Sequence, residues 1–454
     1  KLFVMDQNND DQFFDALVNA DMNDIDIESF NAHSDMIGLD KIHEAKPYNE
    51  SEIFAVSDEY YKTKGIMAWS NRAAKIVPHK VGTNYQSALA FAKLVKANIK
   101  NYSWNEHINI LECGAGSGRF SRHLLHAFQE LDLLGKCCLL ITDYSKLNLE
   151  EIRDSSILDG FEEGDNYKLI EFDIVNANRG TNLEGKRFNL NNIGAVFLHY
   201  VLDALPLTVL RNKADHQEEL CLTAHRRKDQ TYDLLENDFF QARLQLQESW
   251  QAYDWSKQTE AERYYHEHLQ EFYRHSKDDI YYCYSALRAI DNINRLLDDR
   301  AFILSSDILA CSDKRYVIVG NSVAHKIDSE FILDWQKQQG NQGCIINEPD
   351  KNLSRLLITK SEKVLEEVRP AFEEHYIIEN NIIQYLEMEK ALEHLIKGND
   401  PESLLVLLRQ FTKLAPHCAT TYKFWSEYYK MIKKDNYAME ALAKARTLDH
   451  WSDI

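Results

Sequence analysis

The chain has 454 residues, more than one ordinary hydrophobic core accommodates, and this length predicts two or three domains. Apolar residues make up 44% of the chain and aromatic residues 11%, which argues against a globally disordered protein. Asp and Glu number 72 against 52 Lys and Arg. The resulting net charge of −20 repels a phosphate backbone, so we expect no nucleic-acid partner.

The cysteine and histidine patterns predict neither a disulfide framework nor a metal site. Eight cysteines are scattered without a CxxC pair or another spacing typical of zinc ligands. No apolar stretch has the length of a membrane-spanning helix. These features predict a cytoplasmic protein, although a secreted effector would share them.

Strand and helix patterns alternate through the first half of the chain. Residues 1–66 are polar and acidic, and we interpret them as an N-terminal region and candidate lid. Short apolar runs predict strands at 108–112, 139–142, 167–172, 194–198 and 300–305, and helical periodicity is found at 84–100, 119–134 and 286–297. This order predicts an α/β fold with a parallel sheet covered by helices. Residues 344–347 and 356–359 are expected to close the sheet as an antiparallel pair.

Two further regions interrupt or follow the α/β domain. Residues 217–277 are charged, contain no Gly or Pro, and are predicted to form a helical insertion between the domain's two parts, 67–216 and 278–364. Residues 365–454 are predicted to be entirely helical. Within them Tyr437-Ala-Met-Glu-Ala-Leu-Ala-Lys-Ala445 has the small-residue spacing of a tetratricopeptide-type (TPR-like) helix.

The segment Glu112-Cys-Gly-Ala-Gly-Ser-Gly118 lies where the first predicted strand turns into a helix. Glycines at such a turn let the backbone approach a ligand and direct amides toward it. Asp143 closes the second strand, where a carboxylate can accept hydrogen bonds from both hydroxyls of a ribose. Asp173 closes the third strand, where it can accept from an adenine amino group.

This pattern leaves two cofactors open, a nicotinamide dinucleotide and S-adenosylmethionine. A dinucleotide fingerprint requires a glycine three places after Gly116, where this chain has Arg119. Glu112 would also repel a pyrophosphate, whereas it suits the amino group of a methionine moiety. We therefore favour S-adenosylmethionine. The simpler alternative is a glycine turn in an unrelated α/β protein whose acidic residues cap helices.

Several segments resemble the MidA-type S-adenosylmethionine-dependent methyltransferases, and in particular a bacterial branch with a C-terminal tetratricopeptide region. The resemblance spans roughly residues 65–450 and is carried by Ile110-Leu-Glu-Cys-Gly-Ala-Gly-Ser-Gly-Arg-Phe120, Ile141-Thr-Asp-Tyr-Ser145 and Val201-Leu-Asp-Ala-Leu-Pro206. It extends to Phe302-Ile-Leu-Ser-Ser-Asp307. It implies a Rossmann-like, seven-stranded class I methyltransferase sheet with one antiparallel strand near its edge.

The resemblance also implies roles for individual residues. Glu112, Gly114 and Gly116 would hold the methionine end, Asp143 the ribose and Asp173 the adenine. The whole predicted cofactor site consists of Glu112, Gly114, Ala115, Gly116, Gly118, Asp143, Tyr144, Asp173 and Ile174. Asp203 and Pro206 would shape the substrate-side loop. Tyr60-Tyr61, Gly65 and Met67-Ala-Trp69 precede the first helix, where such enzymes often place a lid.

The chain departs from the family pattern at His199-Tyr200, where members commonly have Asn-Glu or Asn-Tyr. His199 is a candidate general base with a pKa suited to neutral pH, or a residue that only hydrogen-bonds within its loop. Tyr200 is a candidate aromatic wall for the sulfonium, or ordinary core. His199, Tyr200 and Asp203 are the predicted catalytic residues.

The resemblance implies methylation of a protein side-chain nitrogen, on Arg or Lys, and hence a protein substrate. Two other classes stay open at this point. One is a binding or scaffold protein that kept the fold and lost catalysis, which the departure at His199-Tyr200 favours. The other is a nicotinamide-dependent oxidoreductase.

Overall fold

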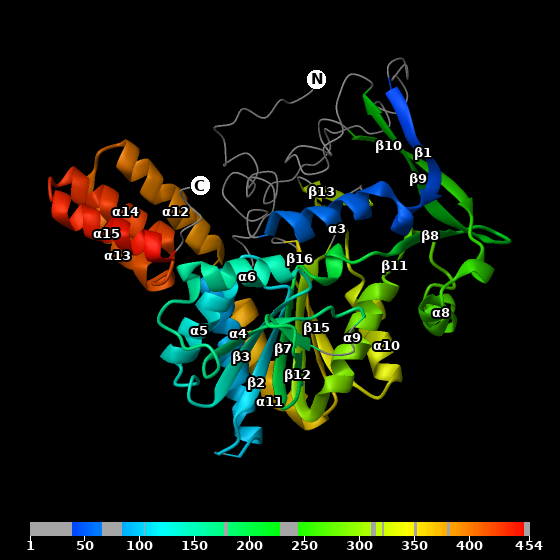
Figure 1. The fold of residues 1–454 in the computed structure, drawn as a ribbon, viewed down its shortest axis with the longest axis horizontal. Coiled ribbons are helices and arrows are strands. Elements are labelled where there is room, and N and C mark those ends of the chain that lie inside the picture. Colours follow the sequence, from blue (N-terminus) through cyan, green and yellow to red (C-terminus); the bar gives the residue numbers. More distant parts are fainter. Residues whose placement is uncertain are drawn as a thin grey trace.

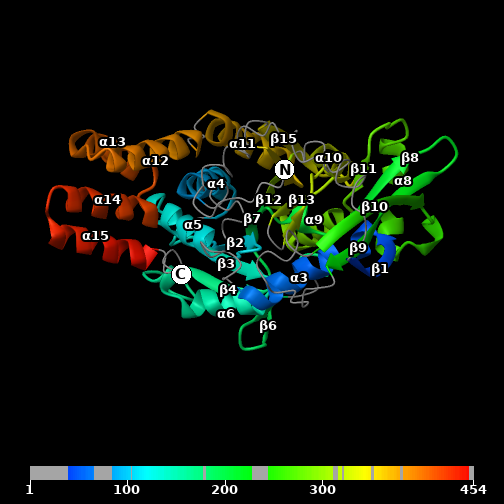
Figure 2. The same cartoon turned by 90° about the horizontal axis from the view of Figure 1, so that it is seen from above.

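The computed structural model describes residues 39–65, 84–103, 105–176, 180–227, 244–309, 315–319, 322–348, 352–378 and 382–448. A central sheet with helices on both faces separates a wing of strands from a group of C-terminal helices (Figure 1). The view from above shows the wing and the C-terminal helices at opposite ends of the molecule (Figure 2). None of the helices within the described residues combines the length and apolar character that crossing a membrane requires.

The central sheet has the strand order β15–β16–β12–β7–β2–β3–β4–β5–β6. Its strands are β2 (Ile108–Cys113), β3 (Cys137–Asp143), β4 (Tyr167–Glu171), β5 (Gly180–Asn182), β6 (Arg187–Phe188), β7 (Ile193–His199), β12 (Leu297–Ile308), β15 (Gln342–Glu348) and β16 (Leu353–Thr359). The run from β12 to β4 is parallel, and β16 is antiparallel to both neighbours. The seven predicted strands and the antiparallel strand near the edge are therefore confirmed. The short β5 and β6 extend the opposite edge.

Alternating residues of the strands divide the core into two layers. Ile110, Ala195 and Phe302 belong to one hydrophobic cluster, whereas their neighbours Leu111 and Val196 belong to the other. The first cluster is covered by α4 (Tyr85–Asn98), α5 (Arg119–Glu130), α6 (Lys146–Asp154) and α11 (Glu362–Glu373). The second is covered by α9 (Tyr284–Leu296) and α10 (Ser329–Gln338). This arrangement is the predicted parallel sheet with helices on both faces.

A second sheet forms the wing, and it corrects the prediction of a helical insertion. It contains β1 (Leu39–Pro47), β8 (Thr208–Asn212), β9 (Gln217–Arg227), β10 (Leu244–Ala252) and β11 (Ile280–Tyr282). β9 pairs antiparallel with β1, β8 and β10. Of the predicted helical insertion, 217–277, the described part is helical only over α8 (Glu260–Phe272) and a single turn at Trp255–Lys257.

The period-two pattern of β9 explains why the helical prediction failed. Leu220, Leu222 and Ala224 are fully buried and alternate along the strand. This period-two spacing is typical of a strand, although Cys221, Thr223 and His225 between these residues are buried as well. The absence of Gly and Pro, which suggested a helix, is equally compatible with a long hairpin strand.

A helix and a two-stranded ribbon lie between the wing and the sheet. The ribbon pairs β13 (Val317–Val319) with β14 (Ser322–Ala324), and α3 (Glu52–Lys64) packs on both β14 and α6. In Figure 1, α3 crosses above the end of the central sheet. The predicted N-terminal region thus contributes β1 and α3, while residues 1–38 and 66 lie outside the described residues.

The C-terminal region is helical, as predicted. After α11, a short helical stretch covers Glu374–Ile378, followed by α12 (Ile382–Lys397), α13 (Pro401–Leu414), α14 (Ala419–Met431) and α15 (Asp435–Leu448). Gln86 of α4 donates to the carbonyl of Leu414 at 2.5 Å, and the rings of His126 and His417 stack 3.8 Å apart. These contacts dock the C-terminal helices on α4 and α5. Their TPR-like character stays a prediction, as do the domain boundaries.

The wing shares one hydrophobic cluster with α9 and α10, and this sharing predicts the effect of Leu222→Ala. Leu222 is fully buried, so we expect its truncation to lower the free energy of unfolding by about 2–5 kcal/mol. Gln251→Ala, at an exposed position of neighbouring β10, should change it by less than about 0.5 kcal/mol. Urea denaturation measures both values. Equal, small effects would mean that the wing is not part of the main core.

Candidate cofactor and substrate site

The glycine segment forms the turn between β2 and α5, as predicted. Gly114, Gly116 and Gly118 have φ angles of 72°, 56° and 74°, in the left-handed region that favours glycine. The turn is closed by the Gly118 amide, which donates to the Ala115 carbonyl at 2.9 Å. Ala115 itself is buried, and its amide donates to the Thr142 carbonyl of β3 at 2.9 Å.

Neighbouring side chains pack closely against two of these glycines. A Cβ on Gly114 would lie 2.9 Å from Cγ2 of Val201, which follows β7. A Cβ on Gly118 would lie 3.1 Å from Cγ1 of Ile152 on α6. The turn is therefore packed against the segment after β7 and against helix α6.

Asp143 connects the ends of β3 and β2. Its Oδ2 accepts from the Gly116 amide at 3.0 Å, and its Oδ1 accepts from the Ser145 amide at 2.8 Å. The side chain is buried, and this burial raises its pKa, while the two backbone hydrogen bonds lower it in part. Each carboxylate oxygen can accept a second hydrogen bond, so these contacts leave capacity for ribose hydroxyls.

Glu112 is a buried acid whose hydrogen-bonding capacity is incompletely used. Its Oε2 has no hydrogen-bond partner among the described residues. Burial raises the pKa of Glu112 to about 8, and the charge of Asp143 adds to the shift. A buried, unpaired acceptor costs about 1–3 kcal/mol, so a ligand that supplies a donor here removes that cost. A cationic amino group fits this position.

The remaining predicted cofactor residues lie at the ends of β3 and β4. Tyr144 is partly exposed, and its pKa is raised by desolvation and then by nearby charges that include Asp143 and Asp173. Asp173 is exposed and caps its own turn, accepting from the amides of Val175 at 2.9 Å and Asn176 at 3.1 Å. Ile174 is buried beside it. The structure thus brings Asp143, Tyr144 and Asp173 together.

Helix α3 covers this edge of the sheet. The Tyr61 hydroxyl donates to the Ser322 hydroxyl at 2.6 Å, and its raised pKa reflects desolvation first and then nearby groups that include Asp203 and Asp143. Lys62 lies 5.8 Å from the Tyr144 ring centre. α3 ends at Gly65, where a side chain would collide with Glu151 of α6. The predicted lid residues Met67-Ala-Trp69 lie outside the described residues.

His199 ends β7 and differs from the expected general base. Its ring stacks on Phe197, with centres 5.7 Å apart, and neither buried ring nitrogen has a hydrogen-bond partner among the described residues. Burial and then the charge of Arg355 lower the pKa of His199 to about 3. The expected pKa near neutrality is therefore wrong. The imidazole is neutral at pH 7 and can accept a hydrogen bond.

Tyr200 and Asp203 occupy the turn after β7. Tyr200 has a φ of 51°, an uncommon conformation for a residue with a side chain. Asp203 is 1% exposed and lies against Asp307 of β12, which is also 1% exposed. Burial and the charge of Asp307 raise the pKa of Asp203 well above its usual value. Asp203 is thus a buried partner of a second carboxyl rather than an acid open to solvent.

Two residues of the site were not assigned a role from the sequence. Asp307 was part of the family resemblance, yet nothing in a strand-ending Ser-Ser-Asp shows which loop it contacts. Arg355 donates to the Ser306 hydroxyl at 3.0 Å and forms an ion pair with Glu348. Arg355 directly precedes the predicted strand 356–359, and the observed β16 begins two residues earlier, at Leu353. Pairing across strands distant in sequence placed both residues here.

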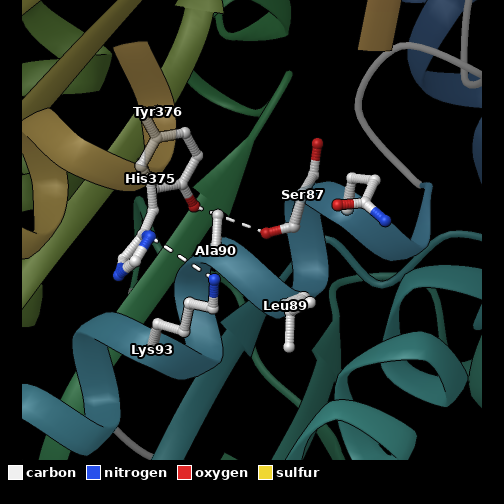
Figure 3. Close-up of a pocket in the computed structure, with 7 residues that line it drawn as sticks. Ser87, Leu89, Ala90, Lys93, His375 and Tyr376 are labelled. Carbon is white, nitrogen blue, oxygen red and sulfur yellow. Dashed lines mark hydrogen bonds between the residues drawn. The ribbon is translucent and has the colours of Figure 1, made fainter. Parts of the chain in front are cut away.

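A separate pocket in the structure is too small to be an alternative cofactor site. It lies between α4 and the helical stretch after α11, with a cavity of about 20 Å³ lined by residues that include Ser87, Lys93 and Tyr376 (Figure 3). Tyr376 and the Ser87 carbonyl are 3.5 Å apart, and Lys93 and His375 are also 3.5 Å apart. This volume suits about one water molecule and no organic cofactor.

A protein-family profile described as "Putative S-adenosyl-L-methionine-dependent methyltransferase" matches residues 88–342, more than half of the chain. The chain belongs to this family. It is an enzyme, a methyltransferase whose cofactor is S-adenosylmethionine. The glycine turn and the acids at the ends of β2 and β3, Glu112 and Asp143, lie within the matched region. No curated protein matches the sequence significantly.

Solved structures that align with this methyltransferase share little sequence with it. A superfamily member from Burkholderia thailandensis, described as a "likely methyl transferase" and bound to S-adenosyl-homocysteine, has a TM-score of 0.45 and 11% identity. The likeness covers 69% of this chain and 88% of that one. The N-methyltransferase NodS from Bradyrhizobium japonicum has a TM-score of 0.30 and 10% identity, covering 69% and 100% of the two chains.

Within the described residues, no group of three or more His, Cys, Asp or Glu is arranged to hold a metal ion. The expectation of a reaction without a metal stays a prediction. The unpaired Glu112 oxygen and the left-handed glycine turn fit the amino-acid end of S-adenosylmethionine.

The glycine turn predicts the effect of Gly114→Ala. A side chain in a left-handed conformation and within 2.9 Å of Val201 should destabilise the protein by about 1–3 kcal/mol. Gly135→Ala is the matched control, because nothing lies within 4 Å of its added Cβ, and we expect a change below about 1 kcal/mol. Urea denaturation compares the variants. Indistinguishable free energies of unfolding would contradict the observed turn.

Proposed function

We propose that this methyltransferase methylates a side-chain nitrogen of a protein, on Arg or Lys. The observation that carries the proposal is the combination of a neutral imidazole at His199, whose nitrogens have no hydrogen-bond partner among the described residues, with the carboxyl pair Asp203–Asp307 at the turn after β7. An arginine or lysine side chain offers N–H donors and positive charge. A neutral imidazole can accept from those donors. Asp307, whose pKa burial raises to about 6, is ionised at pH 7 and creates a negative potential that favours the cation.

In this proposal the cofactor residues have separate roles. When bound, S-adenosylmethionine supplies an electrophilic methyl group. Glu112 would receive its amino group, Asp143 its ribose and Asp173 its adenine. Gly114, Gly116 and Gly118 would let the backbone approach it, with Ala115, Tyr144 and Ile174 as walls. Covering by α3 would exclude water, since Lys62 and Tyr61 reach across the edge.

His199, Tyr200 and Asp203 form the substrate side of the proposed site. His199 would accept a hydrogen bond from the attacking nitrogen. Because its pKa is lowered, His199 is a weak base, and its proposed role is therefore to orient the nitrogen rather than to hold its proton. Tyr200 would supply an aromatic wall. The net charge of −20 favours a basic protein segment as partner. Action in the cytoplasm, without nucleic acid, remains our expectation.

The proposed function predicts a labelled protein with a methylated nitrogen. The full-length enzyme would be incubated with methyl-labelled S-adenosylmethionine and a lysate of its source cells, and the labelled material hydrolysed in acid. We expect acid-stable methyl-arginine or methyl-lysine. Label in nucleic acid, or on protein as a base-labile ester, would contradict the proposal. Intact S-adenosylhomocysteine binding without any labelling would favour a scaffold.

Glu112→Gln separates stability from cofactor binding. The pKa of Glu112 is raised from 4.5 to about 8, so the folded protein keeps a proton that the unfolded chain loses. Its contribution to stability is full below pH 4.5 and is lost as the pH rises through 8. The neutral Gln lacks this loss. We expect the variant to gain stability relative to wild type between pH 5 and 8 in urea denaturation.

The same variant should bind S-adenosylhomocysteine more weakly, by about 1.5–3 kcal/mol, because a charged hydrogen bond to the amino group is lost. Calorimetry measures this affinity. Unchanged affinity would remove Glu112 from the site, whatever the stability curve shows.

A further inference from the structure

The turn after β7 is held in an uncommon conformation. Tyr200 has a φ of 51°, and its amide donates to the Ser306 carbonyl of β12 at 3.0 Å. A residue with a side chain keeps such a backbone only when its surroundings fix it. The contacts that fix this turn therefore determine the positions of His199 and Tyr200.

The Asp307 carboxylate provides those contacts. Its Oδ1 accepts from three consecutive amides, those of Val201 at 3.2 Å, Leu202 at 2.9 Å and Asp203 at 3.3 Å. Its Oδ2 accepts from the Ser305 hydroxyl. Consecutive amides that converge on one anion form a nest, which fixes the backbone dihedral angles of the turn.

Asp203, which belongs to the turn, makes the reciprocal contacts. Its Oδ2 accepts from the Ile308 amide at 3.3 Å, and its carbonyl accepts from the His325 amide at 3.0 Å. The turn and the end of β12 thus hold each other through reciprocal carboxyl-to-amide bonds. Neither the parallel ladder between β7 and β12 nor the apolar core supplies them.

We infer that Asp307 is the positioning residue of the substrate-side turn, and that it sets the geometry of His199 and Tyr200 toward the methyl acceptor. This inference rests on the proposed function, because only methylation gives that geometry a consequence. Asp307 acts through the turn and does not touch the substrate. The cofactor edge at Gly114–Gly118 is held by separate hydrogen bonds to Asp143, and it meets the substrate-side turn where Val201 packs against Gly114.

Asp307→Ala and Asp307→Asn test the inference in the full-length protein. Alanine removes the acceptor of three buried amides, so their hydrogen exchange should accelerate by about 10- to 100-fold. Asparagine keeps one acceptor oxygen for the nest, and exchange at Val201–Asp203 should stay within about 3-fold of wild type. The labelling rate of the protein substrate should follow the same order, while S-adenosylhomocysteine affinity changes less than about 2-fold.

Asp291→Ala is the matched control for simple destabilisation. Asp291 lies on α9 and accepts from Tyr265, Trp335 and Gln336, none of which belongs to the turn. We expect this variant to lose stability without faster exchange at Val201–Asp203 and without slower labelling. A comparable loss of labelling in Asp291→Ala would overturn the positioning role.

Hydrogen exchange decides the inference independently of substrate. Unchanged exchange in Asp307→Ala, or equal labelling by the Ala and Asn variants, would overturn it. If wild type labels no protein, the proposed function fails by itself, and the exchange data still report on the nest. Should Asp307→Ala not fold, Ser305→Ala and Asp307→Asn remain, and labelling by Asp307→Asn more than 10-fold below wild type would contradict the inference.

Discussion

The hydrogen bond from the Gly116 amide to the Asp143 carboxylate joins the two strand ends on which the cofactor edge is built. At 3.0 Å it ties a left-handed glycine to the end of β3, and the other oxygen of Asp143 holds the start of α6 through Ser145. Gly114 and Gly118 lie against Val201 and Ile152, so the glycine turn also contacts the segment after β7 and helix α6.

The second constraint is the burial of acidic side chains at one edge of the central sheet. These acids differ in how the desolvation cost of their burial is offset. Glu112, Asp143, Asp203 and Asp307 are at most 3% exposed. Asp143 and Asp307 accept hydrogen bonds from backbone amides through at least one oxygen, which offsets much of the desolvation cost. One oxygen of Glu112 has no hydrogen-bond partner in the part of the chain that the structure describes. A protein retains such a desolvation cost where a bound ligand removes it. Glu112 is therefore the residue whose desolvation cost the cationic end of the cofactor would offset most.

The parts predictable from the sequence are those set by local pattern. The strand at Ile108–Cys113, the glycine turn and the strand-ending Asp143 follow from apolar runs that end in glycine or acid. The wing was mispredicted because its alternating residues, such as Leu220 and Leu222, were interpreted through composition rather than through period. Asp307 could not be recognised, since its partners lie more than a hundred residues earlier and meet it only after β7 and β12 pair. The low pKa of His199 depends likewise on burial and on Arg355 from β16.

His199 shows how the departure from the family pattern fits the site. Its ring is oriented by stacking on Phe197, which in turn stacks on Phe120 with centres 4.4 Å apart, and not by hydrogen bonds. Stacking fixes the plane of the imidazole, and its two buried nitrogens have no hydrogen-bond partner among the described residues. Burial and the nearby charge of Arg355 both favour the neutral imidazole over its protonated form. The neutral ring adds no charge of its own, so Asp307, which holds the substrate-side turn and is ionised at pH 7, is the source of negative potential there.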